Sequence, residues 1–173
     1  CCIGQGLGGA TWLVLRLRNI EGLPWRMPGG STEGEEIRMT DAIGYERIGD
    51  IAVLKAQNPP VNALGYDIRE GLLAGIERAE KDGAKAVLIY GDGRTYFAGA
   101  DITEFGKPPR GIFLPDLCTR IESSPLLVVS ALHGTALGGG LEVALGSHYR
   151  IAVPSARVGL PEVLIGVLPG AGG

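Results

Sequence analysis

The sequence is poor in cysteine and histidine. Its 173 residues include three cysteines, Cys1, Cys2 and Cys118, and two histidines. The cysteines are too few and too unevenly placed for a disulfide framework, and no set of Cys and His residues has the spacing of a metal site. These absences argue against a disulfide-stapled domain and a zinc module. They favour a reducing compartment, which we expect to be the cytoplasm.

The sequence also lacks a positive charge excess and a long apolar run. Its net charge is −3, whereas nucleic-acid binders usually present a basic face. No apolar run approaches the roughly 18 residues of a membrane-spanning helix, and the first residues lack the charged-then-apolar order of a signal peptide. We expect no nucleic-acid or membrane partner, although helix N-termini and a few lysines can hold a small anionic ligand.

The overall composition, 45% hydrophobic and 20% charged residues, is that of a soluble globular domain. The first 38 residues nevertheless differ from the rest. They contain both tryptophans, a Gly- and Pro-rich stretch at residues 23–30 and one strand-like run at residues 11–17. We predict that Met39 is the natural start and that residues 1–38 are upstream sequence. The alternative is a genuine but poorly ordered extension.

Residues 39–173 alternate between strand and helix patterns. We expect a hairpin over residues 45–56 that turns at Gly49-Asp50, strands at residues 85–90, 126–132 and 149–153, and helices at residues 67–81, 112–123 and 138–146. This alternation requires right-handed crossovers and a largely parallel sheet, so the predicted fold class is α/β. Periodicity does not separate a doubly wound sheet from a ββα spiral, and the hairpin favours the spiral only slightly.

Two glycine-containing segments differ from ordinary α/β sequence. They are Phe97-Ala98-Gly99-Ala100-Asp101-Ile102 and His133-Gly134-Thr135-Ala136-Leu137-Gly138-Gly139-Gly140-Leu141-Glu142. Glycines at a helix start cost backbone entropy but leave N–H groups and the positive helix end open to another molecule. Such a backbone suits an oxyanion, for example a thioester enolate, which needs two N–H donors aimed at one oxygen. The alternative is that the glycines only allow close packing of the helix on a strand.

Two carboxylates lie near these glycines. Glu142 falls three residues into the helix that starts at Gly139, where its negative charge can simply interact favourably with the positive end of the helix dipole. Glu162 follows Pro161, where its simplest role is a charge at a helix start. As a pair in different environments they suit general acid/base chemistry on water. Sequence spacing leaves open whether they converge.

Other polar residues have simpler interpretations. Asp101 is expected to cap the turn that follows its loop, and Cys118 is expected to fill the core. His133 and His148 have no nucleophile or acidic partner in a recognisable arrangement, so we expect structural or exposed positions for both.

Four motifs resemble those of the crotonase, or enoyl-CoA hydratase/isomerase, superfamily, and they occur in the family's order. They are Asn58-Pro59-Pro60-Val61-Asn62-Ala63, Phe97-Ala98-Gly99-Ala100-Asp101-Ile102, Ala136-Leu137-Gly138-Gly139-Gly140-Leu141-Glu142, and Gly159-Leu160-Pro161-Glu162 with Gly166-Val167-Leu168-Pro169-Gly170. The likeness covers about residues 45–173. Residues 148–162 look most like the hydratase part of a multifunctional β-oxidation protein that also carries 3-hydroxyacyl-CoA dehydrogenase.

The resemblance implies a ββα spiral with an oxyanion hole for a thioester carbonyl. The backbone N–H groups of Ala100 and Gly139 match the two donors of that hole. Ala63 and Ala98 match the positions that contact the CoA arm of the substrate. No metal or redox cofactor is implied, because coenzyme A is part of the substrate.

Glu142 and Glu162 match the two hydratase carboxylates, which hold and activate water and deliver a proton to the α-carbon. Because many superfamily members lack one or both, their retention favours an enoyl-CoA hydratase of fatty-acid β-oxidation. The alternatives are a Δ3,Δ2-enoyl-CoA isomerase and a non-catalytic acyl-CoA-binding fragment.

Two features depart from the family pattern. The first 38 residues have no counterpart, and the chain stops at Gly170-Ala171-Gly172-Gly173, where relatives continue into helices that complete the acyl pocket and the subunit interface. We therefore expect a fragment with weak activity. We expect the intact protein to be a homo-oligomer or to be fused to a 3-hydroxyacyl-CoA dehydrogenase.

Overall fold

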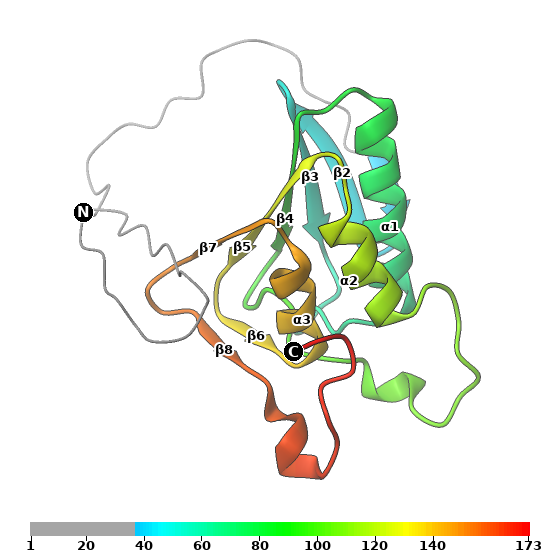
Figure 1. Ribbon diagram of the computed structural model, residues 1–173, viewed down its shortest axis with the longest axis vertical. Coiled ribbons are helices and arrows are strands. Elements are labelled where there is room, and N and C mark those ends of the chain that lie inside the picture. Colours follow the sequence, from blue (N-terminus) through cyan, green and yellow to red (C-terminus); the bar gives the residue numbers. More distant parts are fainter. Residues whose placement is uncertain (1–36) are drawn as a thin grey trace. The chain divides into compact units, whose positions relative to one another are not determined.

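The computed structural model describes residues 37–173, which lie in one compact unit, Ser31–Gly173 (Figure 1). The first described element is strand β1 (Ile37–Thr40), which starts two residues before Met39, the boundary expected from the sequence. The strand predicted at residues 11–17 lies outside the described residues.

A six-stranded sheet forms one layer of this unit. Its strands, in spatial order, are β1, β2 (Ile43–Ile48), β3 (Ile51–Ala56), β4 (Ala86–Gly91), β5 (Leu127–Leu132) and β7 (Tyr149–Ala152). The first three strands are antiparallel, and β3, β4, β5 and β7 are parallel. The predicted hairpin is confirmed, because β2 and β3 pair on either side of Gly49-Asp50.

Helices connect the parallel strands. α1 (Tyr66–Lys81) joins β3 to β4, α2 (Leu114–Glu122) joins β4 to β5, and α3 (Gly139–Gly146) lies between β5 and β7. The strand order advances in one direction and such crossovers are right-handed, so the three helices lie on the same face of the sheet, as Figure 1 shows. The predicted α/β class is confirmed.

A second, two-stranded sheet consists of β6 (Thr135–Leu137) and β8 (Arg157–Gly159), which pair in parallel. β6 follows β5 and β8 follows β7, so two successive turns of the chain each give one strand to each sheet. After these strands come α3 and the short 3-10 helix η2 (Pro161–Ile165), respectively. This repeated order is a ββα spiral, and it decides against the doubly wound sheet.

The core lies between the main sheet and the helices. Its largest fully buried side chains include Leu54, Leu72, Tyr96 and Phe97. Cys118 is 6% exposed within this core, as predicted. Burial raises the pKa of its thiol to about 12, so this cysteine is a packing residue rather than a nucleophile.

Candidate active site

Parallel pairing in the small sheet brings two distant segments together. At the carboxyl ends of β6 and β8, Leu137 pairs with Gly159, and the N–H of Gly138 donates to the carbonyl oxygen of Gly159 at 2.9 Å. α3 begins after the first end and η2 after the second. The first turns of these two helices therefore lie close together, and each carries one of the predicted glutamates.

Glu162, in η2, lies directly against Gly138. A Cβ atom at position 138 would lie 2.5 Å from Oε1 of Glu162, and Gly138 has a φ of +49°, so glycine alone satisfies both conditions. The other carboxylate oxygen, Oε2, is buried and has no hydrogen-bond partner among the described residues. An unsatisfied buried acceptor costs about 1–3 kcal/mol, so this oxygen is suited to a polar group of a ligand or to water.

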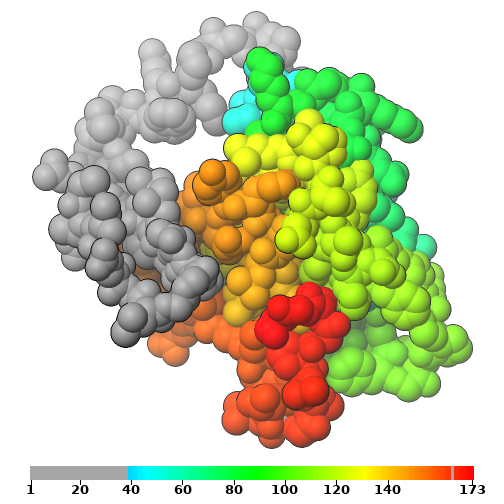
Figure 2. Space-filling view, viewed as in Figure 1, coloured from blue at the N-terminus to red at the C-terminus, as the bar shows by residue number. Residues whose placement is uncertain are grey.

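Glu142, in the first turn of α3, is held by the end of the chain. It is 3% exposed, and its Oε1 accepts hydrogen bonds from the N–H groups of Ala171 at 2.5 Å and Gly173 at 3.1 Å. Figure 2 shows these last residues, in red, on the surface over α3. Two N–H donors on one oxygen orient the carboxylate and stabilise negative charge on it.

The segments that carry the two predicted oxyanion donors are in contact. The N–H of Leu137 donates to the carbonyl oxygen of Phe97 at 3.1 Å, and Gly140 packs against the same residue. Within residues 37–173, the N–H groups of Ala100 and Gly139 donate to no other group of the protein. Two unpaired donors on adjoining segments are the arrangement that an oxyanion hole requires.

The two predicted CoA-contacting residues lie on another pair of adjoining segments. The N–H of Ala98 donates to the carbonyl oxygen of Val61 at 3.2 Å, which places residues 61–64 beside residues 98–100. Leu64 forms an isolated parallel bridge with Ala100. Ala63 and Ala98 therefore lie on neighbouring backbone segments, close to Ala100, one of the predicted oxyanion donors.

Asn62 holds this arrangement together, and sequence reasoning assigned it no role. It is 3% exposed with a φ of +50°, and its side-chain amide donates to the carbonyl oxygens of Asp92 at 2.8 Å and Thr95 at 2.9 Å. Its Oδ1 accepts from the N–H of Asn58 at 2.8 Å. The signal was present in the sequence, because asparagine tolerates the left-handed conformation and can satisfy loop backbone groups.

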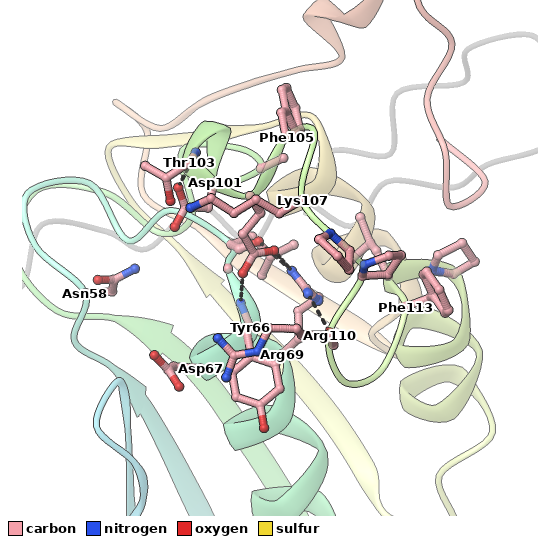
Figure 3. Close-up of a pocket in the computed structure, with 18 residues that line it drawn as sticks. Asn58, Tyr66, Asp67, Arg69, Asp101, Thr103, Phe105, Lys107, Arg110 and Phe113 are labelled. Carbon is pink, nitrogen blue, oxygen red and sulfur yellow. Dashed lines mark hydrogen bonds and ion pairs between the residues drawn. The ribbon is translucent and has the colours of Figure 1, made fainter.

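A cavity of about 650 Å³ opens beside these segments, and Figure 3 shows its lining. Leu64, Ala100 and Leu114 form part of the wall. A Cβ atom at Gly139 would lie 2.7 Å from Leu114 Cδ2 and 4.0 Å from Glu142 Oε2. Neither predicted glutamate lines the cavity, and Gly139 lies between its wall and Glu142.

Arg69 and Glu104 fix residues 102–113, which form another wall of the cavity. They form an ion pair at 2.9 Å, and the N–H of Tyr66 donates to Glu104 at 2.6 Å (Figure 3). Arg69 also donates to three backbone carbonyl oxygens, those of Leu64, Arg110 and Ile112. All of these contacts except that of Arg69 with Leu64 link positions far apart in the sequence, so no local pattern could have indicated them.

Asp101 has the structural role predicted for it. It caps the 3-10 helix η1 (Ile102–Glu104) by accepting a hydrogen bond from the N–H of Thr103 at 2.9 Å. Hydrogen bonds from Thr103 hold the pKa of the Asp101 carboxyl below its usual range. His133 and His148 each form a hydrogen bond with a backbone group.

Two other kinds of site are absent from residues 37–173. No three His, Cys, Asp or Glu side chains are grouped so that they could hold a metal ion. In the same part of the chain, no helix is long and apolar enough to cross a membrane.

Comparison with known proteins decides the family. Residues 46–173 match the enoyl-CoA hydratase/isomerase family. The chain belongs to this family. The resemblance of the four sequence motifs is thereby confirmed over almost the whole stretch where it was seen.

Two relatives are similar to this chain in sequence. Identity is 44% over 131 residues with a protein of Bacillus subtilis named probable enoyl-CoA hydratase, covering 71% of this chain and 51% of that protein. Identity is 48% over 124 residues with a peroxisomal bifunctional enzyme of Danio rerio, covering 71% of this chain and 17% of that protein. The chain thus spans about half the length of the first relative and less of the second.

Solved structures of family members share the fold. An enoyl-CoA hydratase from Thermoplasma volcanium superposes with a TM-score of 0.68 at 30% identity, over 76% of this chain and 56% of that one. One from Bacillus anthracis gives 0.69 at 27% identity, over 76% and 55%. The crotonase-type ββα spiral expected from the resemblance is therefore confirmed.

Proposed function

We propose that the chain carries the catalytic residues of an enoyl-CoA hydratase, which adds water across the 2,3 double bond of a 2-enoyl-CoA in fatty-acid β-oxidation. The observation that carries this proposal is the placement of Glu142 and Glu162 at the same glycine turn, Gly138-Gly139, next to an N–H that has no partner in the described part of the chain. Membership of the enoyl-CoA hydratase/isomerase family and a relative named probable enoyl-CoA hydratase support it.

In the proposed mechanism the N–H groups of Ala100 and Gly139 bind the thioester carbonyl oxygen of the substrate. Addition of a hydroxyl group at the β-carbon moves electron density onto this oxygen, and the two donors stabilise the enolate that results. Loss of one such donor typically costs about 2.7–4 kcal/mol of barrier lowering. Ala63 and Ala98, on the adjoining backbone, would contact the CoA arm.

Glu142 and Glu162 divide the proton transfers. Glu142, which two N–H groups orient, is proposed to accept a proton from water as the oxygen attacks the β-carbon. Glu162, whose Oε2 has no hydrogen-bond partner among residues 37–173, is proposed to deliver a proton to the α-carbon. Exchange with solvent then returns the proton from Glu142 and restores the proton on Glu162, so the net change is the addition of one water molecule, which needs no redox partner and no metal ion.

Hydration of crotonyl-CoA tests the proposal directly. We expect the chain to remove the ultraviolet absorbance of the conjugated thioester and to give a 3-hydroxy product whose oxygen comes from labelled water. Migration of the double bond of a 3-enoyl-CoA without uptake of labelled oxygen would favour the isomerase instead. Binding of a saturated acyl-CoA without either reaction would favour the non-catalytic alternative.

The assembly and the cellular compartment of the whole protein are also proposals, because the chain spans about half of the Bacillus subtilis relative. The whole protein is proposed to be a homo-oligomer or to be fused to a dehydrogenase. The name of the Danio rerio relative, a bifunctional enzyme, supports fusion. The low cysteine content favours a reducing compartment, and the cytoplasm is proposed as that compartment. Native mass and cell fractionation would check assembly and compartment.

A further inference from the structure

Three buried hydroxyl groups form a hydrogen-bonded chain that leads to the C-cap of α3. The hydroxyl of Tyr96 lies 2.8 Å from Ser130 Oγ, and Ser130 Oγ lies 2.7 Å from Ser147 Oγ. All three residues are at most 3% exposed. Ser147 Oγ in turn donates to the carbonyl oxygen of Val143 at 3.3 Å. Buried polar groups that satisfy one another in this way restrict the packing around them to one arrangement.

The direction of these hydrogen bonds follows from counting protons. Ser147 has one hydroxyl proton and gives it to Val143, so it can only accept from Ser130. Ser130 then has no proton left for Tyr96 and must accept from it. The chain therefore runs from Tyr96 through both serines to the backbone of α3, and it ends one residue after Glu142.

Both ends of α3 are connected to one dipeptide, Tyr96-Phe97: the start through the backbone of Phe97, and the far end through the hydrogen-bonded hydroxyl groups. Phe97 holds the start of the helix, because its carbonyl oxygen accepts from Leu137 and its backbone packs on Gly140. Tyr96 reaches Ser147, the C-cap residue of the helix, through Ser130. Ala100 follows this dipeptide by only a few residues, so the segment that carries one proposed oxyanion donor also holds the helix that carries the other.

We infer that Tyr96 is a positioning residue whose hydroxyl, acting through Ser130 and Ser147, sets the direction of α3 and so aligns the N–H of Gly139 with that of Ala100. This role rests on the proposed function. Arg150 also holds the far end of the helix, by donating to the carbonyl oxygens of Ala144, Leu145 and Ser147. Loss of the Tyr96 hydroxyl removes a second restraint on that end, so the helix, fixed at its start by Phe97, tilts slightly and turns its first N–H away from the substrate carbonyl. Small errors in the placement of catalytic groups are costly, about 100-fold for 1 Å.

The variant Tyr96→Phe tests this role, because it removes the hydroxyl and keeps the ring. We expect kcat for crotonyl-CoA to fall about 10-fold, with KM changed less than about 2-fold, because the lost alignment matters most when charge develops on the carbonyl oxygen. Ser147→Ala breaks the same chain at its other end. The double variant should be no slower than the slower single variant, because both act through one connection.

Tyr45→Phe is a matched control. Tyr45 is 2% exposed, and its hydroxyl donates to Asp82 Oδ2 at 2.9 Å, in a part of the sheet that carries none of the proposed catalytic groups. Loss of this hydroxyl should lower the melting temperature by an amount similar to that in Tyr96→Phe and leave kcat unchanged.

The carbonyl stretching frequency of bound, isotope-labelled butyryl-CoA gives a readout without turnover, because hydrogen bonds to the thioester oxygen lower this frequency. The unaltered chain and Tyr45→Phe should lower it, and Tyr96→Phe should restore most of the difference from the free ligand. The same lowering in Tyr96→Phe would overturn the positioning role alone. No lowering in the unaltered chain would overturn the proposed oxyanion hole, and the positioning role with it.

Discussion

The helices α1 and α3 both contain glycines, but the glycines of α1 serve packing alone. A Cβ atom at Gly71 would lie 2.5 Å from Ile43 Cγ1, and one at Gly75 would lie 2.5 Å from Leu54 Cδ2. These glycines let a long helix lie close to the sheet. Around them, apolar residues at helical spacing face the core and charged residues face solvent.

The three glycines at the start of α3 have different neighbours. Gly140 packs closely on Phe97, as a packing glycine does. Gly138 instead meets the carboxylate of Glu162, and Gly139 keeps an N–H without a partner among the described residues. The alternative interpretation of the sequence, that these glycines only allow close packing, therefore explains one glycine of the three. Close contact with a proposed catalytic carboxylate, or an unused donor, sets Gly138 and Gly139 apart from the packing glycines of α1.

Replacement of the two glutamates at the glycine turn of α3 should have the largest effect on the hydration rate, whereas replacement of a glutamate in α1 should have none. Glu142→Gln and Glu162→Gln keep the shape of the side chain and remove its proton transfer, so each should lower the rate of crotonyl-CoA hydration by about 100- to 10,000-fold. Acyl-CoA binding should change little. The control is Glu77→Gln on the exposed face of α1, which should leave the rate unchanged. Full turnover in either active-site variant would remove that residue from the mechanism.

Loss of the N–H at Gly139 should have the next largest effect. Gly139→Pro deletes the donor at the first position of α3, where a helix tolerates proline, and hydration should slow by about 100- to 1,000-fold. Gly139→Ala is the matched variant, because it adds a Cβ atom against the flexible end of Leu114 and keeps the N–H. If both variants lose the same activity, crowding rather than the donor is responsible.

A packing glycine in α1 should affect stability and leave the chemistry intact. Gly75→Ala places a methyl group against Leu54 Cδ2 and should lower the free energy of unfolding by about 1–3 kcal/mol. Gly170→Ala, at a position with nothing within 4 Å, should be close to neutral. Urea unfolding measures both. Equal stability of the two variants would contradict the assignment of Gly75 to packing.

The smallest effect is expected at Asp101, where hydrogen bonds from Thr103 lower the pKa below the ordinary value of 3.8. A carboxyl whose pKa is lower in the folded state stabilises the fold above its ordinary pKa. That contribution is lost as the pH falls below about 3.8 towards the folded value. Asp101→Asn should therefore reduce the difference in unfolding free energy between pH 7 and pH 3. Asp116→Asn, at an exposed site, serves as the control.

Most regular elements could be predicted from the sequence, because their patterns are local. The helix predicted at residues 67–81 differs from α1 by one residue at its start, and the strand at residues 126–132 differs from β5 by one. The helix predicted from residue 112 begins at Leu114, because Phe113 takes the extended N-cap conformation. Apolar spacing fixes the body of a helix more firmly than its ends.

The short strands and the contacts of the site could not be predicted in this way. β6 and β8 have three residues each, too few to show a period, yet their pairing brings Glu142 and Glu162 to one turn. The hydrogen bonds of Ala171 and Gly173 to Glu142 join residues about 30 positions apart. The motifs indicated which residues matter, whereas long-range pairing decides how they meet.

The hydration rate of crotonyl-CoA in a double-mutant cycle of Glu142→Gln and Glu162→Gln tests the central claim most directly. If the two carboxylates act on one substrate as a unit, the double variant should be about as slow as the slower single variant. If the two losses multiply, or if neither substitution slows hydration, the carboxylates do not act together at the glycine turn.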